Sequence, residues 1–146
     1  MNAPGAAKLY TPELLGLAVQ LAGYPSDPAL GLKGDARSRT CGSHLEIDLS
    51  LGDDYRIEKI GMRVTACAVG QAAAAIFANA AEGQTGETLA AALDDLENWL
   101  KGTGTLPDWP GLAALSPARD HTGRHGAILL PWKAAAAALC KAGQAG

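Results

Sequence analysis

The stretch RIEKIGMRVTACAVGQAAAAIF, residues 56–77, changes its periodicity at Cys67. Before the cysteine, Ile60, Met62 and Val64 alternate with other residues, which is typical of a half-buried strand. After it, small and apolar residues recur at helical spacing, at Val69, Ala72, Ala73, Ile76, Phe77 and Ala80. The stretch therefore predicts a strand that passes directly into a buried helix, with Cys67 at the junction.

The residues before this stretch predict a partner strand. Residues 45–49 alternate between an apolar and an acidic face, and residues 50–54, SLGDD, supply a turn. The second strand is predicted for residues 55–65, and a bulge near Glu58 would reconcile the slip in its alternation. The two strands together read as an antiparallel hairpin.

Helical patterns occupy most of the remaining chain. Residues 11–22 and 88–101 have apolar stripes with capping signals, and a last Ala-rich helix runs to about residue 142. Residues 23–40 and 103–126 are rich in Gly, Pro or polar residues and are predicted to be irregular. The predicted fold class is α+β, a small antiparallel sheet with helices packed against it.

The composition fits one domain, residues 1–146, because 48% hydrophobic and 18% charged residues are ordinary values for a globular protein. The net charge of −3 and the lack of a basic block argue against nucleic acid as the main partner. The first ten residues have no signal-peptide pattern, and the uncharged run 64–81 is too interrupted for a bilayer span. We therefore expect a cytoplasmic protein without a membrane segment.

The three cysteines are too few and too widely spaced for a disulfide framework. Cys41 lies in the turn that feeds the first predicted strand, and Cys67 lies at a predicted helix N-terminus, where the helix dipole favours a thiolate. Because a hairpin brings the start of one strand beside the end of the other, Cys41 and Cys67 are predicted to be neighbours. Cys140, at helical spacing from small residues, is expected to pack in the core.

The three histidines are candidate ligands of a metal ion, although each taken alone reads as an ordinary surface residue. His44 lies at the start of the first predicted strand, and His121 and His125 precede the last helix. No nucleophile–base motif or phosphate-binding loop occurs, which lowers the expectation of a hydrolase.

The order of these motifs resembles the NifU/IscU-type iron–sulfur cluster assembly scaffolds, including the SufU branch. The resemblance runs from about Tyr10 to Leu139 and is carried by LYTPELL, CGSHLEIDL, RIEKIGMRVTACAVGQAAAAIF, GETLAAAL and ILLPWKA. It implies an α+β scaffold fold that is not an enzyme. Its implied partners are a cysteine desulfurase, which supplies sulfur, and recipient apo-proteins.

The resemblance also implies a site in which three cysteines and an aspartate hold an Fe–S cluster, iron or zinc. Cys41 and Cys67 match the first two cysteines, but Ser43 stands at the position of the aspartate. The third cysteine, five residues before the aromatic residue that Trp132 matches, is replaced by Ala127. The chain is therefore identified as a divergent member that lacks two of the expected ligands.

Three hypotheses follow from this incomplete set. The first is a scaffold that binds iron or a cluster through Cys41 and Cys67, with His125 as a third ligand; His121, His44, a partner protein or a second protomer are the alternatives. The second is a degenerate scaffold fold that binds zinc or a partner without cluster assembly. The third is a thiol enzyme that uses Cys67 as its nucleophile. The oligomeric state is left open.

Overall fold

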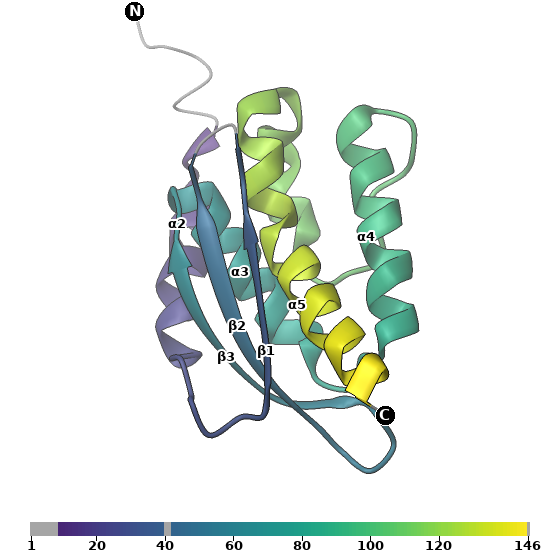
Figure 1. The fold of residues 1–146 in the computed structure, drawn as a ribbon. Coiled ribbons are helices and arrows are strands. Elements are labelled where there is room, and N and C mark those ends of the chain that lie inside the picture. Colours follow the sequence, from purple (N-terminus) through teal and green to yellow (C-terminus); the bar gives the residue numbers. More distant parts are fainter. Residues whose placement is uncertain (1–8, 40–41, 146) are drawn as a thin grey trace, which may run out of the picture.

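The structure is a computed structural model that describes residues 9–39 and 42–145. Its sheet has three antiparallel strands in the order β1-β2-β3, and helices cover one face of it (Figure 1). In chain order the elements are α2 (Pro12–Gln20), η1 (Leu21–Gly23), β1 (Leu32–Arg37), β2 (His44–Leu51), β3 (Ile57–Thr65), α3 (Ala68–Ala81), α4 (Gly86–Lys101), η2 (Leu112–Asp120), η3 (Thr122–Arg124) and α5 (His125–Ala145). The predicted fold class, a small antiparallel sheet with helices packed against it, is confirmed.

The helices form a layer behind the sheet, as Figure 1 shows. Helix α5 packs on β1 and β2, and α3 packs on β3 and on α5. Helix α2 lies against α3, and α4 lies against the other side of α5. The first turns of α3 and α5 are thereby brought to one end of the molecule.

Strand β1 corrects the prediction that residues 23–40 are irregular. Its sequence, LKGDAR, has few apolar residues, and Gly34 interrupts the alternation that marks a strand. The glycine is required by packing, because a Cβ at this position would overlap the carbonyl oxygen of Ala134 and lie 2.8 Å from the Ala138 nitrogen. Gly34 therefore weakens the strand pattern in the sequence, and it also allows α5 to lie directly on β1.

The predicted hairpin and its bulge are confirmed in β2 and β3. The register shifts between Ser50 and Leu51 and leaves Glu58 as the extra residue of β3. The strand starts at Ile57 rather than at Tyr55, because Tyr55 belongs to the turn and has a left-handed backbone with φ of 64°.

The core lies between the sheet and the helix layer, and α3 is its most deeply buried element. Ten of the fourteen residues of α3 are buried, and its alanines allow its neighbours to approach closely. Beside it, Phe77, Trp109 and Trp132 form an aromatic cluster with ring centroids 5.3–5.5 Å apart. These large rings fill the volume that the small residues leave.

The remaining helices agree with the predicted segments within a few residues. Thr11 caps α2 and Gly102 ends α4 in a left-handed conformation, as their positions in the sequence indicate. The segment 103–126, predicted to be irregular, instead contains the two short 3-10 helices η2 and η3. None of the helices in the described part of the chain is long and apolar enough to cross a membrane.

Candidate functional site

Cys67 is the N-cap residue of α3, at the junction predicted from the sequence. Its side chain is half-buried and carries a free thiol. Its carbonyl accepts a hydrogen bond from the Gln71 backbone nitrogen at 2.9 Å, and the Gln71 side chain donates to the Ala66 carbonyl at 3.0 Å. These contacts fix the entry into α3, and the thiol lies at the N-terminal, positive end of the helix dipole.

Cys41 lies outside the described residues, but the described residues on either side of it make defined contacts. Gly42 has a φ of 70°, and its nitrogen donates to the Ser38 carbonyl at 3.1 Å. The next residue pair, His44 and Thr65, joins the start of β2 to the end of β3. The described residues that flank Cys41 therefore lie at the end of the sheet from which the chain leads to Cys67. That the two thiols lie close together stays a prediction.

Ala127, at the position where the resemblance implies a third cysteine, is fully buried against the start of α3. A Cβ at Gly70 would lie 3.2 Å from the Cβ of Ala127 and 2.7 Å from that of Ala66. The first turns of α3 and α5 are thus in direct contact. Gly70, which Ala127 contacts, lies about one helical turn after Cys67, and alanine at residue 127 offers no ligand atom.

His125, predicted as a third ligand, is half-buried at the start of α5. Its Nε2 lies 2.6 Å from the carbonyl oxygen of Arg119. Because a carbonyl only accepts, Nε2 donates, and the lone pair of the neutral ring is on Nδ1. Metal-binding histidines commonly have one ring nitrogen held in this way. His121, the other candidate from the same segment, is half-buried at the end of η2.

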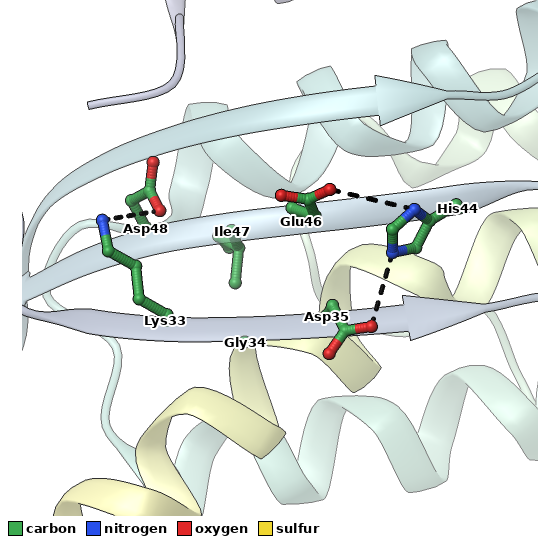
Figure 2. Close-up of a pocket in the computed structure, with 7 residues that line it drawn as sticks. All are labelled: Lys33, Gly34, Asp35, His44, Glu46, Ile47 and Asp48. Atoms are coloured by element: carbon green, nitrogen blue, oxygen red, sulfur yellow. Dashed lines mark hydrogen bonds and ion pairs between the residues drawn. The ribbon is translucent and has the colours of Figure 1, made fainter. Parts of the chain in front are cut away.

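His44 lies in a shallow hollow of about 310 Å³ on the face of the sheet that the helices leave open (Figure 2). Its Nε2 is 3.4 Å from Asp35 Oδ2, and its Nδ1 is 3.9 Å from Glu46 Oε1. Both ring nitrogens thus face carboxylates, Asp35 on the neighbouring strand β1 and Glu46 on β2 itself, which favours a role in the sheet surface over ligation. Within residues 9–39 and 42–140, no three His, Cys, Asp or Glu side chains are grouped so as to hold a metal ion.

Asp48 is a buried charge whose role the sequence did not reveal. Its carboxylate is 2.9 Å from Lys33 Nζ, and it accepts hydrogen bonds of 2.9 Å from Ser26 Oγ and the Asp27 nitrogen. Burial raises the pKa of Asp48, but the hydrogen bonds from Lys33, Asp27 and Ser26 outweigh it, so the pKa lies below its ordinary value. The carboxylate therefore fastens the segment before β1 over the sheet, away from Cys67.

The prediction that Cys140 packs in the core is wrong, because its side chain is exposed. Ala134, Ala135 and Ala138 of the same helix are fully buried. At about 100° per residue, Cys140 lies roughly 200° around α5 from Ala138, on the opposite face. Because alanine occurs on both faces of α5, the sequence does not indicate which face is buried.

No protein-family profile matches the sequence, and no curated protein matches it. The structure is similar to that of a nitrogen-fixing NifU-like protein (N-terminal) from Brucella abortus, with a TM-score of 0.84, 26% sequence identity, and coverage of 97% of this chain and 99% of that one.

Two other solved structures share the fold. One, from Fervidobacterium islandicum AW-1, is described as an iron–sulfur cluster assembly scaffold protein for the SUF system; the TM-score is 0.78, the identity 17%, and the coverage 90% of this chain and 96% of that one. The other is described only as a hypothetical protein, with a TM-score of 0.61, 19% identity, and coverage of 85% and 96%. The chain therefore has the fold of the NifU/IscU-type scaffold proteins, and the family assignment made from its sequence is supported by its structure.

Proposed function

We propose that this chain is a scaffold-like protein of iron–sulfur cluster assembly. Cys41 and Cys67 would bind iron or an Fe–S cluster as cargo, with sulfur supplied by a cysteine desulfurase and the product passed to recipient apo-proteins. The protein would act in the cytoplasm and would not itself be an enzyme. The similarity to the Brucella abortus NifU-like protein along almost the whole chain supports this proposal.

The observation that carries the proposal is the contact between the first turns of α3 and α5. The position of Ala127 beside Gly70 supports a site between the start of α3 and the start of α5, to which the segment around Cys41 would add a third part. The segment around Cys41 and the start of α3 would provide thiols, and the start of α5 would provide His125, with the lone pair of its neutral ring on Nδ1. A four-ligand site would need one more donor.

The residues of the chain would hold the cargo in distinct ways. Cys67 would bind the cargo through its sulfur at the start of α3, where half-buried surroundings limit access of water. The bond from His125 to the Arg119 carbonyl would orient the ring. Two thiolates with a single imidazole would hold the cargo more loosely than four thiolates, which suits a protein that must release it.

Anaerobic reconstitution with iron and sulfide tests the proposal. We expect a visible chromophore that is lost in Cys41→Ser and in Cys67→Ser and is retained in Cys140→Ser, because Cys140 is exposed on the far part of α5. His125→Ala should shorten the lifetime of the chromophore without abolishing it. A chromophore of equal yield in the Cys67→Ser protein would refute the assignment.

The second candidate is a degenerate scaffold fold that binds zinc or a partner protein without assembling clusters. It is favoured by the two replaced ligands, since Ser43 and Ala127 stand where the resemblance implies an aspartate and a cysteine. Metal analysis after anaerobic purification separates the two candidates. Zinc without acid-labile sulfide, together with failed reconstitution, would favour the second one.

A further inference from the structure

Strand β1 is an open edge of the sheet. It pairs with β2 on one side, and no strand in the described part of the chain pairs with its other side. The opposite edge is already covered, because Pro25 forms a bridge to Met62 of β3 and the Met62 nitrogen donates to the Tyr24 carbonyl at 2.9 Å. Among the described residues, the sheet therefore has one edge to which a further strand could be added.

The hydrogen-bond pattern of β1 shows which backbone groups point to this edge. The Ser38 nitrogen donates to the Ser43 carbonyl at 2.8 Å, so these two residues form a hydrogen-bonded pair. Because such pairs alternate along antiparallel strands, the backbone groups of Ala36 point toward β2, and those of Asp35 and Arg37 point toward the open edge. Within residues 9–39 and 42–145, no hydrogen bond reaches these outward groups.

The side chains of Asp35 and Arg37 are exposed on the open face of the sheet. In the row that crosses the strands at Asp35, Glu46 follows on β2 and Arg63 on β3. Two carboxylates are thus adjacent, and like charges directly opposite one another are destabilising. His44 lies near both of them, with its Nε2 3.4 Å from Asp35 (Figure 2). The row has its arginine on the β3 side, so a cation on the open side of Asp35 would complete it.

The next row has the opposite requirement. Arg37 lies opposite His44, and His44 lies opposite Thr65, so no carboxylate of the described strands belongs to this row. An added strand that suits both rows presents a basic residue beside Asp35 and an acidic residue beside Arg37. The residue between them would lie beside Ala36, on the face of the sheet that the helices cover, and it should be apolar.

We propose that the β1 edge binds an extended segment of a partner protein, which adds an antiparallel strand through the backbone groups of Asp35 and Arg37. Antiparallel pairing is the slightly more stable arrangement. In this direction the segment reads acidic, apolar, basic, with its acidic residue opposite Arg37. Charged side chains on an edge strand discourage indiscriminate pairing, so the charge order of the segment decides whether the edge accepts it.

A second copy of this chain fits the edge less well, although β1 itself contains the order Asp35, Ala36, Arg37. Two β1 strands paired antiparallel would be related by a two-fold axis perpendicular to the sheet, which places both helix layers on the same side. Helix α4 packs on α5 and lies beyond the β1 edge in Figure 1. The two copies of α4 would therefore collide, whereas a single added strand has no helix layer and avoids the collision.

A fluorescein-labelled peptide, Thr-Val-Glu-Val-Lys-Val-Thr, tests the proposal by anisotropy at low salt. We expect binding, and amide hydrogen exchange at saturating peptide should slow at Asp35 and Arg37, which gain acceptors, but not at Ala36, which is already bonded to β2. The peptide Thr-Val-Lys-Val-Glu-Val-Thr has the same composition and should bind about tenfold more weakly, because two attractions become repulsions.

The matched protein variant is Asp35→Arg/Arg37→Asp, which leaves the net charge unchanged and should reverse the preference between the two peptides. Methylating the Glu and Lys nitrogens of the first peptide removes the donors to the carbonyls of Arg37 and Asp35, and it should abolish binding.

Several results would overturn the proposal. They are no binding of the first peptide, equal binding of the two charge orders, or binding that survives methylation of the peptide nitrogens. Self-association of the unaltered protein that protects the amides of Asp35 and Arg37 would assign the edge to a second copy instead. Reconstitution of the cluster in Asp35→Arg/Arg37→Asp reports separately on the proposed function, because neither residue is a proposed ligand.

Discussion

Ala127 differs by a single sulfur atom from the cysteine that the resemblance implies at its position. Its Cβ is in contact range of the first turn of α3, which Cys67 caps. We predict that Ala127→Cys increases the iron and sulfide bound after anaerobic reconstitution and slows their loss to a chelator, because three thiolates hold a cluster better than two. Metal and sulfide analysis measures the first effect, and decay of the chromophore measures the second.

The matched control for this substitution is Ala138→Cys. Ala138 is also fully buried in α5, but it lies eleven residues farther along, about 16 Å by helical rise. This control should bind no more iron than the unaltered protein. An equal gain in both variants would mean that an extra thiol anywhere suffices, and it would remove Ala127 from the site.

Asp48 gives a second residue-scale prediction, because it is buried and accepts three polar contacts. Asp48→Asn should lower the free energy of unfolding at neutral pH by about 2 kcal/mol, since hydrogen bonds to a charged group are lost. The pKa of Asp48 is lower in the folded protein than its ordinary value of 3.8, so its contribution is complete above that value and is lost as the pH falls through the folded pKa.

The difference between the two proteins should therefore disappear in acid, which urea unfolding at several pH values would measure. Asp53→Asn, at an exposed position in the hairpin turn, serves as the control and should change stability little. If the difference in free energy of unfolding between the unaltered protein and Asp48→Asn stays constant into the acid range, Asp48 stabilises the protein through packing rather than through its charge.

At the scale of elements, the contact between α5 and β1 depends on Gly34. Gly34→Ala should destabilise the protein by about 2–3 kcal/mol, because the added Cβ meets backbone atoms of α5 that have no room to move. Gly16→Ala in α2 is the control, since no atom lies within 4 Å of the new Cβ, and it should stabilise by about 0.5–1 kcal/mol. Thermal unfolding of both variants checks the opposite signs.

The sequence predicted elements well where local periodicity and burial agree. Strands β2 and β3, the bulge at Glu58 and the entry into α3 at Cys67 all follow from side-chain alternation and its change. Strand β1 was missed because Gly34, which interrupts its alternation, is required by packing against α5, a helix distant in sequence. The buried face of α5 was misjudged at Cys140 for a related reason, since alanine occurs on both faces and carries no directional signal.

At the scale of the whole molecule, one hydrophobic cluster connects the sheet with α2, α3, α4 and α5. We therefore predict a single cooperative unfolding transition, as expected for one domain with one core. Far-ultraviolet circular dichroism and tryptophan fluorescence should give the same midpoint. Two separated transitions would show that the part after α3 folds independently.

The candidate site was predictable only in part. The sequence predicted Cys67 at the entry into α3, which the structure confirms, and the resemblance implied a missing cysteine at Ala127. That both residues belong to one metal site stays a prediction. The sequence did not indicate that His125 donates to the Arg119 carbonyl or that Asp35 and Glu46 turn toward His44, because these contacts depend on how loops and strands come together.

The glycine at residue 70 has a consequence for how such a site could be gained or lost. Any larger side chain there would press on Ala66 and Ala127 and push the starts of α3 and α5 apart. A cysteine could be introduced at residue 127 while Gly70 remains. If Gly70 were replaced first, the first turns of α3 and α5 would be separated, and a cysteine at residue 127 would lie farther from Cys67. The two positions are therefore coupled, and the order of substitutions decides whether a third thiol can be recovered by a single step.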